Sequence, residues 1–148
     1  MNVQIKILDK DRVTNIPSYG TLGSAAVDLS ACISDSIFLQ SGECKLVGTG
    51  VAISIGDANY AAMILPRSGL GHKKGLVLGN GTGLIDSDYQ GELMVSCFNR
   101  SKEIVEITPL MRFAQLMIVP VMQAKFELVD EFSESTIRAG GGFGHTGV

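Results

Sequence analysis

Short segments in which apolar and polar residues alternate dominate the sequence, and they predict β-strands. Residues 3–7 alternate strictly, which is typical of a strand that buries one face. Similar segments rich in Val, Ile and Leu, separated by turn-forming residues, cover residues 45–55, 60–65, 92–98, 103–108 and 112–121. Many short strands joined by regular turns predict an all-β sandwich, barrel or jelly roll.

Helical patterns are nearly absent, and the chain shows no internal repeat and no linker. One short helical turn is expected over residues 68–74, with Ser68 as its N-cap. Residues 1–135 are predicted to form one β-domain and residues 136–148 a mobile tail. Residues 139–148 hold five glycines and a single aromatic side chain, Phe143, which is unusual for a purely solvated end.

Composition and charge narrow the class of partner. The 148 residues carry a formal net charge of −3, and the longest basic run is the pair at positions 73 and 74. A protein that binds duplex nucleic acid would carry a basic stripe, whereas a small phosphorylated ligand needs only a few cations. The longest apolar run, residues 116–122, is far too short to cross a membrane. The cysteines form no C-x-x-C motif, which predicts reduced thiols in a cytoplasmic protein; they are Cys32, Cys44 and Cys97.

Residues 66–71 (PRSGLG) combine groups that suit a phosphate. Arg67 contributes a guanidinium and Ser68 a hydroxyl, at the point where a helical turn would leave its first amides unpaired. A guanidinium fork beside free amides matches phosphate oxygens. The segment on its own is more typical of a capped turn with a surface arginine than of a phosphate site.

Two further segments place polar groups beside strands. Residues 79–83 contain Asn-Gly, the strongest short signal for a hairpin, and Asp86 follows two apolar residues, so it is expected at the rim of a buried strand. Asp28 is a single acid in an apolar strand, which predicts a partner or an ion. Arg112 and Gln115 open another strand, where regular alternation would place them on opposite faces.

Taken in order, these segments resemble the five motifs of the trimeric dUTPase family. The similarity spans nearly the whole chain, at residues 26–31 (AVDLSA), 66–71 (PRSGLG), 83–91 (GLIDSDYQG), 112–116 (RFAQL) and 138–147 (RAGGGFGHTG). Two details depart from the family pattern. Ala26-Val27 stands where glycine and an aromatic residue are common, and the last motif has Ala139 and His145 where glycine and a small residue are common.

The resemblance implies a jelly-roll-like subunit that forms a homotrimer with its sites at subunit interfaces. The implied activity is hydrolysis of dUTP to dUMP and pyrophosphate with Mg²⁺, which limits uracil incorporation into DNA and supplies dUMP for thymidylate synthesis. Asp86 would be the general base that activates water. Asp28 would reach the metal through water, because Mg²⁺ retains several waters and is held mainly by substrate phosphates.

The same resemblance assigns the remaining contacts to substrate. Phosphate oxygens would be held by Arg67, Ser68, Gly69, Gln115 and Arg138. Asn80 and the backbone at Leu84 and Ile85 would read uracil, while Tyr89 and Met94 would line the deoxyribose pocket. The tail would close over the site, with Phe143 stacked on the base.

Two other readings remain open from the residues. A dCTP deaminase of the same fold would need a catalytic group, typically a glutamate, at the exocyclic amine, where residues 79–82 offer none. A non-catalytic nucleotide sensor would not need Asp86 together with Ser68 and Arg138. Ammonia release from dCTP would favour the first alternative, and tight binding without turnover the second.

Overall fold

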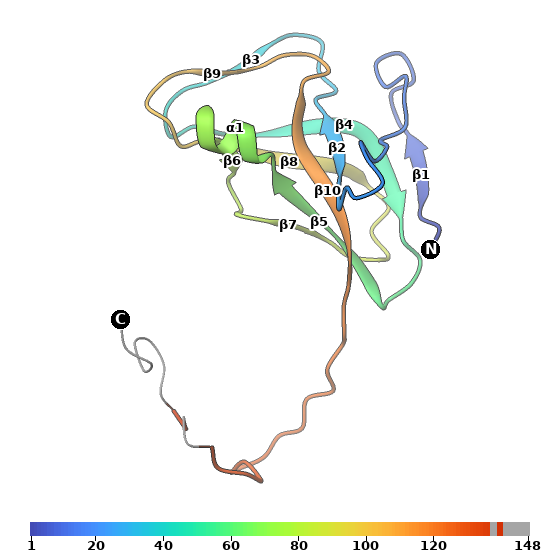
Figure 1. The fold of residues 1–148 in the computed structure, drawn as a ribbon, viewed down its shortest axis with the longest axis vertical. Helices are drawn as coiled ribbons and strands as arrows, with labels where there is room; N and C mark the ends of the chain where they lie inside the picture. The colour runs from blue at the N-terminus through green and yellow to red at the C-terminus, as the bar shows by residue number, and fades with distance from the viewer. Residues whose placement is uncertain (137–138, 141–148) are drawn as a thin grey trace.

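Antiparallel strands build the body of the protein, as the computed structural model shows for residues 1–136 and 139–140 (Figure 1). One four-stranded sheet has the order β1 (Gln4–Ile7), β4 (Cys44–Ser54), β8 (Glu92–Asn99) and β6 (Leu76–Leu78). The second has the order β2 (Val27–Ser30), β10 (Arg112–Pro120), β5 (Tyr60–Pro66) and β7 (Gly83–Ile85). A third, two-stranded sheet pairs β3 (Ile37–Leu39) with β9 (Val105–Ile107). The predicted all-β fold is confirmed.

Alternation along the strands produces the core. In β8 every second residue, from Leu93 to Asn99, is buried and the residues between them are half-buried. Side chains from both large sheets meet in one apolar cluster, in which Phe113 is the largest fully buried residue. Burying a side chain of this kind contributes about 1.5–3 kcal/mol. The sheets are therefore held as one unit, and their outer edges and loops are left to carry polar groups.

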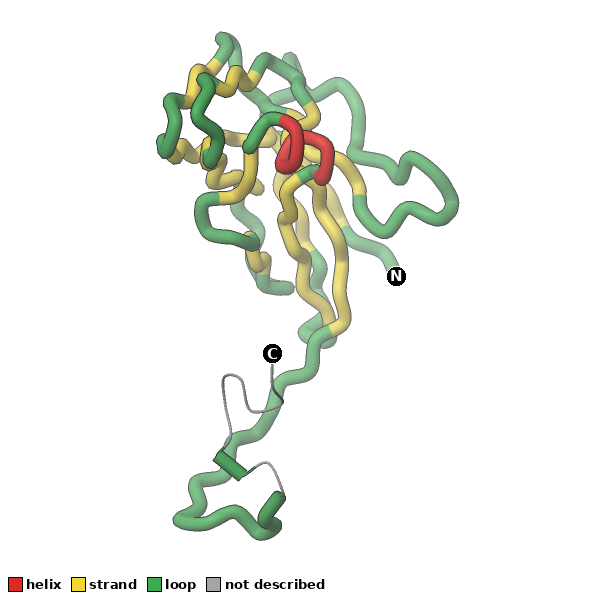
Figure 2. Tube along the Cα trace, turned by 60° about the vertical axis from the view of Figure 1, so that its left-hand side comes forward, coloured by secondary structure: helices red, strands yellow, loops and turns green. Residues whose placement is uncertain are grey.

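The one helix of the described residues is α1 (Ser68–Lys73), directly after β5 (Figure 2). Its predicted position is confirmed, although its N-cap is Arg67 and not Ser68, and no side-chain hydrogen bond caps it. Ser68 is thus the first helical residue, so its hydroxyl is not used as a cap. No described helix is long and apolar enough to cross a membrane.

A kink in β4 requires a glycine. The register between β4 and β8 shifts between Gly48 and Ala52, and inside this bulge Gly50 has a φ of 68°. The Gly50 amide donates to Oε1 of Glu92 at 2.8 Å. A Cβ at position 50 would lie 2.7 Å from Sγ of Cys32 and 2.7 Å from a methyl of Val13. Conformation and space therefore both demand glycine at this position.

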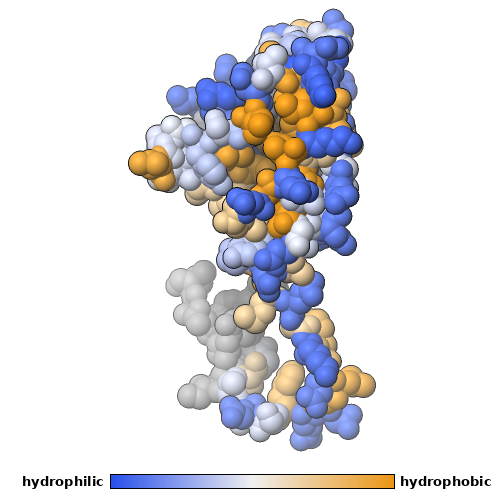
Figure 3. Space-filling model, turned by 90° about the vertical axis from the view of Figure 1, so that its right-hand side faces the viewer, coloured by the Kyte–Doolittle hydropathy of each residue, from blue (hydrophilic) through white to orange (hydrophobic). Residues whose placement is uncertain are grey.

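After β10 the chain leaves the body as an extended arm, residues 122–136, without strands or helices (Figures 1 and 2). Large apolar side chains on this arm are almost fully exposed; they are Met122, Phe126, Leu128 and Phe132. Figure 3 shows orange, hydrophobic surface along the lower part of the molecule, where the arm lies. The arm follows the last strand, β10, which ends at Pro120. The division of the chain into a domain to residue 135 and a tail from residue 136 stays a prediction.

Candidate active site

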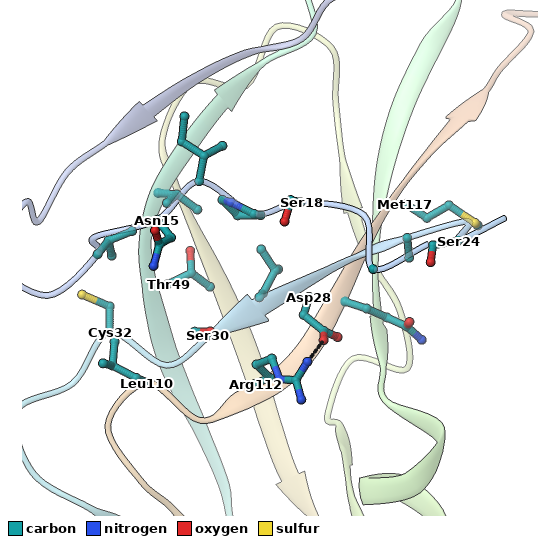
Figure 4. Close-up of a pocket in the computed structure, with 18 of the residues that line it drawn as sticks. Asn15, Ser18, Ser24, Asp28, Ser30, Cys32, Thr49, Leu110, Arg112 and Met117 are labelled. Carbon is teal, nitrogen blue, oxygen red and sulfur yellow. Dashed lines mark hydrogen bonds and ion pairs between the residues drawn. The ribbon is translucent and has the colours of Figure 1, made fainter. Parts of the chain in front are cut away.

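Asp28 is the centre of a charged cluster on the second sheet. Its Oδ1 lies 2.9 Å from Nε of Arg67, and its Oδ2 lies 3.1 Å from Nη1 of Arg112 (Figure 4 shows the second pair). The acid in the apolar strand therefore has partners, as predicted. Two guanidinium groups around one carboxylate leave a net charge of +1, and all three side chains are at least partly open to solvent. Such a cluster is suited to attract an anion.

The face on which Arg112 lies differs from the prediction. The ladder between β10 and β2 shifts between Arg112 and Ala114, so the strand contains a bulge at this point. A bulge adds a residue and reverses the alternation beyond it, so Arg112 and Gln115 line the same hollow instead of opposite faces. Arg112 was absent from the predicted site because no pattern of residue types announces this bulge.

Hydrogen bonds to the backbone hold the cluster in place. Nη1 of Arg67 donates to the carbonyl of Arg112 at 3.0 Å, and Nε2 of Gln115 donates to the carbonyl of Pro66 at 3.0 Å. These bonds join the end of β5 to β10, where Ala114 pairs with Pro66. Arg67 and the beginning of α1 are therefore positioned by the sheet itself.

Two backbone amides lie beside this cluster. The first helical hydrogen bond of α1 runs from Gly71 N to Arg67 O at 2.9 Å, so the amides of Ser68 and Gly69 have no acceptor within the helix. Together with the Arg67 guanidinium they present donors to a phosphate group.

A hollow of about 850 Å³ opens next to Asp28. Figure 4 shows its polar lining, with Asn15, Ser18 and Ser24 from the N-terminal loop on one side and Arg112 on the other. Within residues 1–136 and 139–140, no three side chains of His, Cys, Asp or Glu gather as a metal cage. Asp28 is the acid that faces this hollow.

The predicted hairpin at residues 79–83 is wrong, although its turn is present. Gly81 has a φ of 73°, and its amide donates to the carbonyl of Leu78 at 3.1 Å. The strands on either side diverge, because β6 pairs with β8 whereas β7 pairs with β5. Each three-residue strand lies along a longer strand, which stabilises it better than a three-residue partner would. Asn80 is left exposed at the tip.

Asp86 leaves β7 directly after Ile85 and is exposed, as expected for a residue at a strand rim. The carbonyl of Asp86 accepts from the amide of Tyr89 at 3.2 Å, which closes a tight turn. The Tyr89 hydroxyl donates to the carbonyl of Glu92 at 2.9 Å and so holds the aromatic ring beside β8. Met94 follows on β8 as one of its half-buried residues.

Asp86 lies far from the Asp28 cluster within one chain. Ile85 pairs with Ala62, near the beginning of β5, whereas Arg67 follows the end of that strand. Asp86 is one residue beyond Ile85, so the same register continued by one residue would place it opposite Ala61. The six residues from there to Arg67 correspond to about 20 Å of strand. Within one chain, Asp86 therefore does not reach the Asp28 cluster.

The family of the chain follows from comparison with known proteins. A family model described as dUTPase matches residues 12–147. The chain belongs to the dUTPase family. It is 72% identical to the deoxyuridine 5'-triphosphate nucleotidohydrolase of Francisella philomiragia subsp. philomiragia and 74% identical to that of Francisella tularensis subsp. novicida. Both similarities cover 100% of each chain.

Solved structures of dUTPases share the fold. The Staphylococcus bacteriophage 80alpha dUTPase with dUPNHPP is 27% identical, with a TM-score of 0.83 over 99% of each chain. A mutant dUTPase from phage phi11 of S. aureus, solved with a structural Mg(II) ion, is 25% identical, with a TM-score of 0.78. That similarity covers 90% of this chain and 100% of the phage chain.

Within this dUTPase, the residues expected at the site fall into three sets. Asp28, Arg67, Ser68, Gly69 and Gln115 lie together at one end of the second sheet. The second set comes from β7, from the turns on either side of it and from β8; its members are Asn80, Leu84, Ile85, Asp86, Tyr89 and Met94. Arg138 and Phe143 lie outside the described residues, so their roles stay predictions.

Proposed function

We propose that this dUTPase hydrolyses dUTP to dUMP and pyrophosphate with Mg²⁺, as a homotrimer whose sites are shared between subunits. The substrate and products are those of its curated relatives, which are named deoxyuridine 5'-triphosphate nucleotidohydrolase. The observation that carries the shared site is the separation of Asp86 from the Asp28 cluster along β5. The chain contains both Asp86 and the Asp28 cluster, yet a single subunit holds them apart.

A closed ring of identical subunits resolves this separation. In a cyclic trimer the contacts are heterologous, so the Asp86 edge of one subunit can meet the Asp28 cluster of the next. Exposed apolar side chains on the arm of residues 122–136 support an oligomer, because such surface is usually covered by a partner. Sedimentation of the purified protein measures this state directly, and a monomer would contradict the shared site.

Phosphate binding is assigned to the Asp28 cluster and the beginning of α1. Arg67 and the amides of Ser68 and Gly69 donate to phosphate oxygens, with Gln115 and Arg138 further out. Both oxygens of Asp28 are already paired with arginines, so its carboxylate suits an ion held through waters better than a direct ligand. Bound to the phosphates, Mg²⁺ would neutralise the charge of the triphosphate.

Asp86 acts as the general base. Its exposed carboxylate accepts a proton from a water molecule whose oxygen forms a bond to the α-phosphorus. The bond from that phosphorus to the bridging oxygen of the β-phosphate breaks, and pyrophosphate leaves. Donors around the phosphates are fixed before the reaction by the backbone bonds of Arg67 and Gln115, which favours the charged transition state.

Selectivity for deoxyuridine is assigned to the second set. Asn80 and the backbone of Leu84 and Ile85 read the uracil edge, and a cytosine there would leave buried donors or acceptors unpaired, at a cost of about 1–3 kcal/mol each. Tyr89, fixed by its bond to the Glu92 carbonyl, lies against the deoxyribose with Met94 and excludes a 2′-hydroxyl. Phe143 stacks on the base when the tail closes.

The alternatives find less support in the described residues. The carboxylate of Glu92, the glutamate that follows the Tyr89 turn, accepts from the Gly50 amide and is occupied in the β4 bulge. It is therefore not free to act on an exocyclic amine, as a dCTP deaminase requires. Free thiols at all three cysteines support a cytoplasmic location. Release of pyrophosphate from dUTP, without ammonia from dCTP, is the experiment that tests the assignment.

A further inference from the structure

The turn that carries Asn80 rests on the outer face of the first sheet. Gly79 directly follows β6, and its amide donates to the carbonyl of Ser96 in β8 at 2.8 Å. Because β8 lies between β6 and β4, the next strand contributes Cys44 at its first position. The Cys44 thiol and the Ser96 hydroxyl lie 3.2 Å apart, directly beneath the Gly79 backbone.

This pair occupies the space that a side chain at position 79 would need. A Cβ on Gly79 would lie 2.5 Å from Sγ of Cys44 and 2.9 Å from Oγ of Ser96. Gly79 has no left-handed backbone conformation, so close approach alone demands glycine there. Gly81 is the opposite case, since its φ is 73° and nothing lies within 4 Å of its Cβ position. The tip of the turn is open, and its base is tightly packed.

We infer that Cys44 and Ser96 are positioning residues for uracil recognition. Together they form the floor on which the turn of residues 79–82 rests, and this floor sets how far the turn stands from the sheet. Asn80 is one residue from Gly79, so a shift of Gly79 moves the side chain assigned to the base. Among the described residues, the other backbone bonds of the turn run from Gly81 to Leu78 and from Thr82 to Asn80, within the turn or to the end of β6. The contact with the floor therefore determines where the turn lies over β8 and β4.

The inference rests on the proposed function and adds a prediction about substrate affinity. A larger side chain at position 44 pushes Gly79 outward and lengthens the hydrogen bonds to the uracil edge. Loss of one such bond weakens binding by roughly tenfold. Asp86 and the phosphate cluster do not touch the floor, so kcat should hardly change. Discrimination against dCTP should fall with the affinity for dUTP.

Three variants test this inference. Cys44→Leu enlarges the floor, and Cys44→Ser replaces the thiol by a slightly smaller hydroxyl that can still bond Ser96. Lys6→Leu adds a leucine at an exposed position of β1, the opposite edge of the sheet. For each variant, KM and kcat are measured with dUTP and dCTP, and the Kd of a non-hydrolysable dUTP analogue is measured by calorimetry. We expect a roughly tenfold rise in KM and Kd for Cys44→Leu, with kcat within about twofold of wild type. Cys44→Ser and Lys6→Leu should match the wild type.

Unchanged KM and Kd in a folded Cys44→Leu protein would overturn the inference, as would an equal rise in Lys6→Leu. If Cys44→Leu does not assemble, Ser96→Ala decides in its place, since it opens a gap in the same floor and should raise KM with kcat retained. A wild-type protein that releases no pyrophosphate from dUTP would contradict the proposed function itself. A wild-type protein that is active while every variant keeps wild-type affinity would contradict only the role of the floor.

Discussion

Mixing two inactive variants should restore activity if each site is shared between subunits. Arg67→Ala removes one guanidinium from the phosphate cluster, and Asp86→Asn removes the base. Arg112 still pairs with Asp28 in the first variant, and Asp86 is exposed in the second, so both proteins should fold. The lost Arg67 pair is about one-third exposed, so it contributes no more than about 1 kcal/mol to stability. Each variant alone forms trimers in which no site is complete.

The recovery expected from mixing follows from the positions of the two residues. About 20 Å of β5 separates Asp86 from Arg67, so a complete site takes Asp86 from one subunit and Arg67 from its neighbour. In trimers that form at random from equal concentrations of the two variants, half of the sites receive an intact Asp86 and half receive an intact Arg67. The mixture should therefore recover about one quarter of wild-type turnover.

The assay is pyrophosphate release from dUTP after the variants are unfolded together in urea and refolded. A matched control mixes Arg67→Ala with Asp28→Asn, whose altered residues lie in the same cluster of one subunit. No site in that mixture is complete, so no activity should return. If the Arg67→Ala and Asp86→Asn mixture also stays inactive while a refolded wild type is active, the site is not shared as proposed.

Substitutions at four positions probe individual residues. Asp86→Asn should still bind a dUTP analogue but lose ~10²–10⁴-fold in turnover, and near-normal turnover would exclude it as the base. Gly50→Ala should lower the free energy of unfolding by about 2–4 kcal/mol, because the left-handed conformation and the contact with Cys32 both oppose a side chain. Gly56→Ala has the same φ of 68° with open space around it, so in urea titrations it should lose clearly less. Phe143→Ala should weaken the closed complex by ~1–3 kcal/mol, whereas Phe143→Trp should retain turnover and change its emission when analogue and Mg²⁺ bind; constant emission would contradict stacking on the base.

Long strands with regular alternation could be predicted from the sequence. The segments predicted at residues 92–98 and 112–121 became β8 and β10, because many alternating positions report the same buried face. The strands β3 and β6 have three residues each and were not predicted, because three positions are too few to show an alternation of apolar and polar residues. The Asn-Gly signal near Asn80 correctly marked a turn, yet the longer neighbouring strands determined where its flanks pair.

Within the site, the residue types were more predictable than their arrangement. Asp86 at a strand exit followed from two apolar residues before it, and Asp28 has charged partners, as an acid in an apolar strand requires. Arg112 contacts Asp28 across 84 residues of sequence through a bulge that no local pattern marks. The distance between Asp86 and Arg67 depends on how β7 lies along β5, which is a property of the sheet and not of either segment.

Magnesium-dependent release of pyrophosphate from dUTP, compared with dTTP, dCTP and UTP at equal concentration, tests the central claim most directly. We predict rapid release from dUTP in the presence of Mg²⁺, and little from the other three nucleotides. Chelation of the metal should abolish the activity, and addition of Mg²⁺ should restore it. Comparable release from all four nucleotides, or tight binding of dUTP without release of pyrophosphate, would contradict the account.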